Sequence, residues 1–141
     1  MKRLTPVAAA LSLSFLLAAS TSLFAENNPK PSTKPAKEVN WKAYGQNLGA
    51  ALRSDNAGLQ RSALQTIILK GDKLILDESM VDLLNVYLVH EHEGFRQLAL
   101  VAIHKTGDAW AMNYLKRHAH EETSPKLKKV LDKVLVDYYG N

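Results

Sequence analysis

The chain has 141 residues and no cysteine, which excludes a disulfide framework and thiolate chemistry. Its 18 Lys and Arg residues against 14 Asp and Glu give a formal net charge of +4 at pH 7. Lys2 and Arg3 lie in a segment that we expect to be removed, so the mature chain of 116 residues would carry +2. This balance excludes a broad nucleic-acid footprint, which needs Lys and Arg clustered on one face. The length suits one domain with one core.

Residues 1–25 have the pattern of a secretory signal peptide. A short basic region is followed by an apolar stretch, broken only by serines, from Val7 to Ala19, and the segment ends in a small residue at Ala25. A transmembrane anchor is the alternative, but it needs about 20 uninterrupted apolar residues. We therefore expect cleavage after Ala25, a periplasmic or secreted protein, and no stable membrane span in the mature chain.

Residues 26–38 read ENNPKPSTKPAKE, with three prolines, three lysines and no large apolar side chain. Such a stretch cannot bury enough apolar surface to offset its conformational entropy, and its spaced prolines favour an extended backbone. We expect a disordered linker here, with a proline-rich recognition peptide as the alternative. A helical domain is then expected over residues 39–141.

Apolar residues after the linker recur at helical spacing and predict six helices. Their expected apolar faces are, in chain order, Trp41, Tyr44, Leu48, Ala51 and Leu52; Leu59, Ala63 and Ile67; Met80, Leu83, Leu84, Tyr87 and Leu88; Phe95, Leu98, Ala99, Ala102 and Ile103; Ala111, Tyr114 and Leu115; and Leu127, Val130, Leu131, Val134, Leu135 and Tyr138. The apolar run at 74–76 has no partner of similar kind, which predicts an extended or single-turn connector instead of a strand.

Polar residues and glycines mark the expected helix ends. The expected N-caps are the Ser54-Asp55-Asn56 cluster for the second helix, Asp77 or Ser79 for the third, Asp108 for the fifth and Ser124, followed by Pro125, for the sixth. Gly71 and Gly107 are expected to take the left-handed conformation of a helix end, with Asp72 and Asp108 capping the next segment.

An internal repeat relates two of the predicted helices to each other. Six of the fifteen residues from Gly58 to Asp72 recur, in sequence, 36 positions later from Gly94 to Asp108. A fixed period of this kind is typical of stacked repeat proteins. Each block runs from a polar turn through a helix to Gly-Asp and into another helix, so the predicted unit is a helical hairpin.

These blocks resemble the HEAT-repeat family, particularly the short HEAT-like units of bilin lyases. The residues that carry the resemblance are Asp55 to Leu64 with Gly71-Asp72, and Glu93 to Leu100 with Gly107-Asp108. The resemblance implies an all-α fold, a short right-handed α-α superhelix (HEAT-like solenoid, armadillo-type) of about six helices. A tetratricopeptide unit is the alternative, because Trp41, Tyr44, Gly45 and Leu48 have the spacing that opens one, although this pattern is not repeated downstream.

Four of the five histidines lie beside acidic residues in two turns. His90 and His92 lie with Glu91 and Glu93, and His118 and His120 lie with Glu121 and Glu122. Equivalent turns of a solenoid stack on one edge, so these side chains would suit Zn²⁺ if they met. Solvated capping residues are the other interpretation, and we assign no metal ligand and no cofactor. His104 is expected to face solvent or a neighbouring turn.

No catalytic constellation is evident in the chain. There is no nucleophile elbow or glycine-rich phosphate loop, and the acidic pairs lie where caps are expected. The resemblance alone would allow a bilin-lyase-like activity, but those enzymes are not normally exported. We expect a non-enzymatic exported adaptor that binds a protein or peptide. The alternatives are a periplasmic metal-binding module and a structural subunit that forms a homo-oligomer through its terminal helix, Leu127 to Tyr138.

The expected binding surface is the concave side of the solenoid. Residues opposite the core stripe of the third and fifth helices include Asp82, Asn85, Val86 and Val89, then Trp110, Asn113, Lys116 and Arg117. Trp and Arg side chains typically anchor protein contacts. The predicted partner-binding residues are Trp110, Arg117, Asn113, Lys116 and Asn85.

Overall fold

A computed structural model describes residues 38–140, which form six α-helices, one short 3-10 helix and no strand. The elements are α1 Trp41–Leu52, α2 Ala57–Lys70, α3 Ser79–Val89, α4 Glu93–Thr106, α5 Ala109–His118, η1 Ala119–Glu121 and α6 Pro125–Tyr139. The all-α class and the number of α-helices are as predicted. The expected signal peptide, and all of the expected linker except its last residue, lie outside the described residues.

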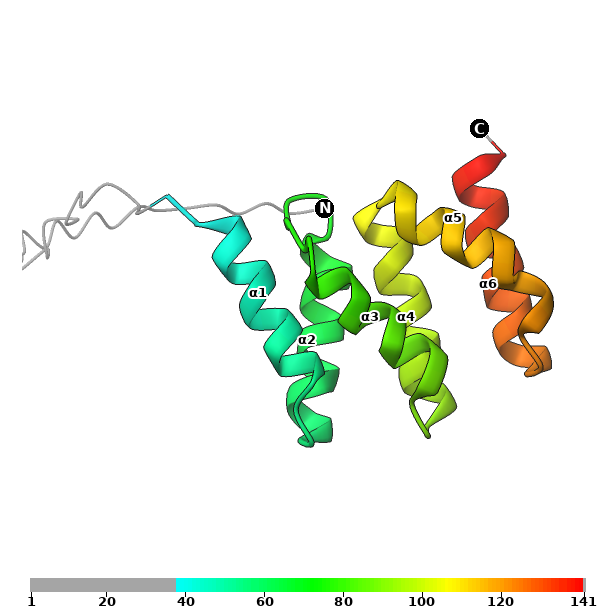
Figure 1. Cartoon of the computed structure of the whole chain (residues 1–141), viewed down its shortest axis with the longest axis horizontal. Coiled ribbons are helices and arrows are strands. Elements are labelled where there is room, and N and C mark those ends of the chain that lie inside the picture. The colour runs from blue at the N-terminus through cyan, green and yellow to red at the C-terminus, as the bar shows by residue number, and fades with distance from the viewer. Residues whose placement is uncertain (1–37, 141) are drawn as a thin grey trace, which may run out of the picture. The chain divides into compact units, whose positions relative to one another are not determined.

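The helices of this unit pack as hairpins in two layers (Figure 1). The helix pairs α1 and α2, α3 and α4, and α5 and α6 are in contact, α1 also packs against α3, and α4 packs against both α2 and α6. The helices α2 and α3 share at most a marginal contact, so the predicted hairpin of these two helices is wrong. The helices α2 and α4 are parallel, because the Arg61 guanidinium lies 4.8 Å from the Phe95 ring centroid at one end and a Cβ on Gly71 would lie 2.7 Å from the Lys105 carbonyl oxygen at the other. The two segments that share the sequence period are therefore adjacent.

The core is centred on α4, which packs against α2, α3 and α6 and also contacts α5. The largest fully buried side chains are Leu64, Ile67, Leu83, Leu100, Ile103, Met112, Leu115, Leu127 and Leu131. The predicted burial of Leu59 and Leu88 is wrong, since they are 48% and 40% exposed, and Val86, expected to face outward, is buried. The helix α3 is covered by both α1 and α4, so its buried arc is turned toward Val86 and away from Leu88.

Two glycines allow α1 to approach α3 and the connector before it. A Cβ on Gly45 would lie 2.2 Å from the carbonyl oxygen of Ile75, and one on Gly49 would lie 2.3 Å from the Ser79 hydroxyl oxygen. Both glycines are buried within α1. The residues before α3 form the predicted extended connector, in which Leu76 is buried.

Helix ends follow the sequence in four cases and depart from it in two. The side chains of Asn56, Asp108 and Ser124 accept hydrogen bonds from the third residue beyond, as predicted for N-caps. Gly107 is left-handed with φ 64°, also as predicted, whereas Gly71 is helical with φ −54°. There the missing side chain allows the close approach to α4, so the prediction of a left-handed turn is wrong.

The start of α3 is the other departure from the predicted caps. Its N-cap is Glu78, which makes no side-chain capping bond, so neither Asp77 nor Ser79 caps it. Asp77 instead has a left-handed backbone with φ 41° and an exposed ion pair to Lys42. Asp72, expected to cap the segment after Gly71, lies exposed in a turn and precedes no helix directly. No helix within residues 38–140 is long and apolar enough to cross a bilayer.

Candidate functional site

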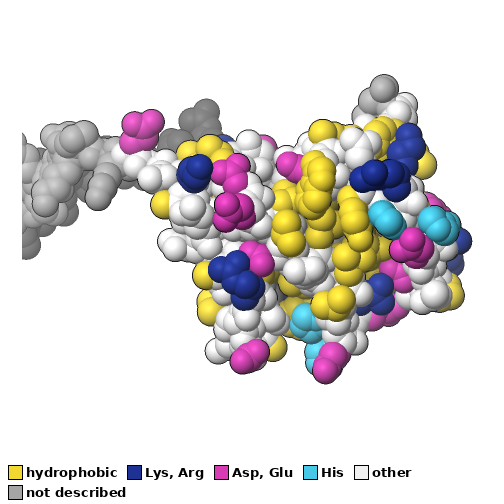
Figure 2. Space-filling model, viewed as in Figure 1, with side chains coloured by type: hydrophobic (Ala, Val, Ile, Leu, Met, Phe, Trp, Pro, Cys, Tyr) yellow, Lys and Arg dark blue, Asp and Glu magenta, His cyan; other side chains and the backbone are white. Residues whose placement is uncertain are grey.

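Hydrophobic side chains gather on one face of the helical unit, over α3 and α5 (Figure 2). The helix α3 exposes Val81 and Leu88, seven residues apart on one helical face, and α5 exposes Trp110, which is 52% accessible. These two helices share at most a marginal contact, so neither covers the other's outer side. Exposed apolar groups that cluster in this way mark interaction surfaces more often than isolated ones do.

One side of α5 carries a stripe of rings and charge, in which Trp110 and Arg117 are exposed and Tyr114 and His118 are half-buried. Trp110, Tyr114, Arg117 and His118 follow the i, i+4, i+7, i+8 spacing of one helical face. The Tyr114 ring stacks on His118 with centroids 4.3 Å apart, and the Trp110 ring lies 6.3 Å from that of Tyr114. Rigid rings beside an arginine supply the kind of contact that dominates binding energy in protein interfaces.

A hollow of about 290 Å³ lies between α3 and α5 and has residues of α4 and η1 in its wall. Leu88 and Tyr114 form apolar parts of the lining, and Arg96 and Glu122 form polar parts. The hollow thus adjoins the exposed stripe of α5 and adds charged groups to an otherwise apolar surface.

The Glu122 carboxylate holds this region together. Its side chain is 1% exposed, and one oxygen accepts hydrogen bonds from the Tyr87 hydroxyl at 2.9 Å and from Arg96 Nη2 at 2.8 Å. The other oxygen accepts from the backbone N–H of Ser124 at 2.9 Å, while Arg96 Nε donates to the Tyr87 carbonyl at 2.7 Å. One buried carboxylate therefore links α3, α4 and the start of α6.

Burial raises the pKa of the Tyr87 hydroxyl far above its usual value of about 10, and the hydrogen bond that it donates to Glu122 adds to this rise. The hydroxyl thus stays protonated in the folded protein at pH values where the unfolded chain ionises. A raised pKa contributes stability below the unfolded value, and this contribution is lost as the pH rises above about 10.

We predict that Tyr87→Phe makes the protein less sensitive to alkali. Above about pH 10 the wild-type free energy of unfolding should fall faster than that of the variant, by about 1.4 kcal/mol per pH unit. Urea unfolding followed by circular dichroism between pH 8 and about 11.5 would measure both curves. Parallel curves would contradict the assignment of the shift to Tyr87.

The structure separates the five predicted partner-binding residues. Trp110 and Arg117 lie together on the exposed stripe of α5. Asn113 accepts a hydrogen bond from the Tyr139 hydroxyl at 3.0 Å, and Lys116 Nζ lies 4.4 Å from the Tyr139 ring centroid, so both face α6. Asn85 lines a different hollow, on the side of α3 that faces α1.

No family model, curated protein or solved structure matches this chain. The evidence for a binding surface is therefore the side chains that α3 and α5 expose. Tyr114 and His118 were not among the predicted residues of this surface, although their spacing from Trp110 was a readable signal. No comparable signal pointed to the Arg96–Glu122 pair, whose members lie 26 residues apart.

The histidine turns do not assemble into a metal site. The His90 ring stacks on Phe95 with centroids 4.3 Å apart and lies within 3.3 Å of the Gln60 side-chain oxygen. Glu93 accepts a short hydrogen bond from the Ser124 hydroxyl, which holds the pKa of this carboxyl below its ordinary value. Among the described residues, no group of three or more His, Asp or Glu side chains is placed to hold an ion.

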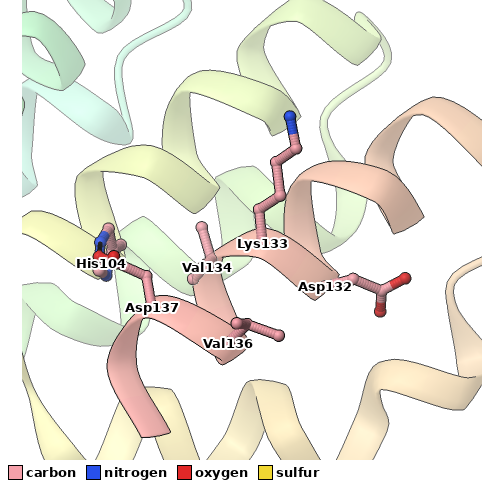
Figure 3. Close-up of a pocket in the computed structure, with 6 residues that line it drawn as sticks. All are labelled: His104, Asp132, Lys133, Val134, Val136 and Asp137. Atoms are coloured by element: carbon pink, nitrogen blue, oxygen red, sulfur yellow. Dashed lines mark ion pairs between the residues drawn. The ribbon is translucent and has the colours of Figure 1, made fainter. Parts of the chain in front are cut away.

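An open groove of about 540 Å³ lies along α6 where it faces α4 (Figure 3). His104 and Asp137 point toward each other, with 2.7 Å between Nε2 and Oδ2, whereas Asp132 and Lys133 point elsewhere. His104 thus contacts α6, and the expectation that it faces solvent or a neighbouring turn is wrong. Because its polar groups diverge, this groove is a weaker candidate than the hollow between α3 and α5.

Proposed function

We propose that this chain is an exported, non-enzymatic adaptor that binds a protein or peptide partner on the surface between α3 and α5. The observation that carries the proposal is one face of α5 that exposes Trp110 and Arg117, next to the half-buried Tyr114 and His118. Tyr114 and His118 share a hollow with Leu88 of α3. Export rests on the basic and apolar pattern of residues 1–25.

The proposed scaffold is a short right-handed HEAT-like solenoid. Its support is the 36-residue period together with the parallel packing of α2 and α4, the two helices that carry that period. Solenoids offer extended surfaces on which side chains of successive repeats act together. Here the helices α3 and α5 belong to successive hairpins and leave such a surface between them.

A non-enzymatic role is favoured because the polar groups near this surface form hydrogen bonds to one another. Glu122, Tyr87 and Arg96 satisfy one another in a buried network. A general acid or base must instead lie within hydrogen-bond reach of the substrate atom to which it gives a proton or from which it takes one. The network is therefore better suited to positioning the surface than to chemistry on a bound molecule.

We expect Trp110→Ala combined with Arg117→Ala to abolish capture of the partner from the native envelope fraction. Both side chains are exposed, so the double variant should keep its helicity, and its free energy of unfolding should stay within about 0.5 kcal/mol of wild type. Affinity capture followed by mass spectrometry, with circular dichroism on the same samples, measures both effects.

A matched control replaces Lys128 and Lys129, two exposed residues of α6, with alanine. This control should capture the same partner as wild type. Capture that survives the loss of Trp110 and Arg117 would refute the proposed surface. Unfolding of that double variant would show instead that Trp110 belongs to the core.

A further inference from the structure

The hollow between α3 and α5 presents unused hydrogen-bond donors. A guanidinium carries five N–H groups, and the bonds to the Tyr87 carbonyl and to Glu122 use two of those on Arg96. This side chain is 24% exposed, and Arg96 lines the hollow. A second anion can therefore approach Arg96 without breaking its pair with Glu122.

His118 lines the same hollow with a similar arrangement. Its Nδ1 lies 3.0 Å from a Glu121 oxygen, and because a carboxylate only accepts, Nδ1 must carry the proton. The opposite nitrogen is a second donor in the doubly protonated form of the ring. Tyr114 and Thr123 also line the hollow, and each carries a hydroxyl group that can donate a hydrogen bond.

The acidic groups of the hollow are engaged with these partners. Glu122 accepts three hydrogen bonds from protein donors, and Glu121 is paired with His118. Because donor capacity remains in excess, the hollow favours a ligand with strong acceptors, and a carboxylate is the strongest that a polypeptide offers.

Apolar groups lie within the same small space. Leu88 and Leu115 line the hollow together with the Tyr114 ring, and a volume of about 290 Å³ is at the lower end for a ligand site. The carboxylate and an apolar group must therefore come from about one residue. A C-terminal residue with an apolar side chain carries both.

We propose that this hollow binds the C-terminal residue of the partner polypeptide, with its free carboxylate on Arg96 and His118 and its apolar side chain against Leu88 and Tyr114. The proposal rests on the proposed function for the polypeptide nature of the ligand. The chemistry of the hollow can nevertheless be tested without any partner, on the protein alone.

The test is titration of the ¹⁵N-labelled protein with small probes, followed by NMR of amides and arginine Nε–H groups. N-acetyl-leucine should shift the Arg96 Nε–H, Thr123 and Leu88 signals with a dissociation constant in the millimolar range, as expected for so small a ligand. N-acetyl-leucinamide, which lacks only the charge, should bind at least tenfold more weakly. The α-amide of N-acetyl-glutamate, which carries a side-chain carboxylate instead, should bind at least threefold more weakly.

Three outcomes would overturn the proposal. These are equal binding of the acid and the amide, tighter binding of N-acetyl-lysinamide, and no shift near Arg96 up to about 50 mM probe, well above the millimolar range expected. Arg96→Lys keeps a charge beside Glu122 but loses the planar fork, so it should weaken N-acetyl-leucine binding at least fivefold. Lys73→Ala, at an exposed position of the connector before α3 and outside the lining of the hollow, should leave binding unchanged.

The two proposals can fail separately. One result is that partner capture is lost in the variant that lacks Trp110 and Arg117 while the wild-type protein binds none of the probes. This result would support the binding surface and refute the carboxylate site in the hollow. Probe binding to the wild-type protein, together with unchanged partner capture by the double variant, would support the carboxylate site and refute the binding surface. If Arg96→Lys does not fold, the NMR signals that the probes shift in the wild-type protein still show whether they bind at Arg96.

Discussion

Replacing Glu122 with alanine is expected to lower the free energy of unfolding by about 3–5 kcal/mol, the usual effect of removing one partner from a buried ion pair. Three donors would lose their acceptor at once: the Tyr87 hydroxyl, the Arg96 guanidinium and the Ser124 N–H. The Arg96 charge would be left in a site where its side chain is 24% exposed. A domain of this size has about 5–15 kcal/mol in total, so much of its stability would be lost.

The adjacent Glu121 provides the control. It has the same side chain and lies next along the chain, yet it is 59% exposed and pairs with a half-exposed histidine. Exposed ion pairs contribute about 0–1 kcal/mol, so Glu121→Ala should change stability by less than about 1 kcal/mol. Chemical denaturation followed by circular dichroism at pH 7 would measure both variants. Equal effects of the two substitutions would show that Glu122 is not a buried link between these helices.

Helix existence and much of helix capping could be read from the sequence because both depend on local chemistry. The 3.6-residue periodicity located all six α-helices, and the capping side chains of Asn56, Asp108 and Ser124 act within three residues of their own positions. Gly107 likewise serves its own helix end. In each case the signal and the structure that it specifies lie in the same short segment.

Errors arose where a distant segment decides the role of a residue. Gly71 resembles Gly107 in sequence, but its place against α4 needs a small residue and not a left-handed turn. The buried arc of α3 is set by two neighbours, which explains why Val86 is buried and Leu88 is exposed. Glu122 has the sequence surroundings of a solvated turn residue, because nothing local indicates its partners in α3 and α4.

The candidate site shows the same division. Trp110 and Arg117 could be placed on one outward stripe from spacing alone. Asn113 and Lys116 have helical positions that are outward for an isolated α5, but α6 returns across that side and brings Tyr139 onto both. The third and fifth helices were expected to carry the surface, but spacing alone could not show which of their residues border it, since that depends on how neighbouring helices cover each one.

The second large effect concerns the contact between α1 and the connector before α3. Gly45→Ala is expected to lower the free energy of unfolding by about 1–3 kcal/mol, because the new methyl carbon would lie 2.2 Å from the Ile75 carbonyl oxygen. That oxygen is part of the backbone and cannot turn aside as a side chain can, so α1 must move. This loss outweighs the gain of up to about 1 kcal/mol that alanine normally brings to a helix in place of glycine.

Gly94→Ala is the matched control, because it makes the same chemical change in the first turn of α4, where an added Cβ meets nothing within 4 Å. It should raise the free energy of unfolding by about 0.4–1 kcal/mol through the smaller entropy of its unfolded chain. The two substitutions are therefore predicted to have opposite signs, which denaturant midpoints at constant slope would reveal. A stabilising Gly45→Ala would mean that α1 does not approach the connector so closely, and it would remove the reason why this helix carries glycine at its interface with α3.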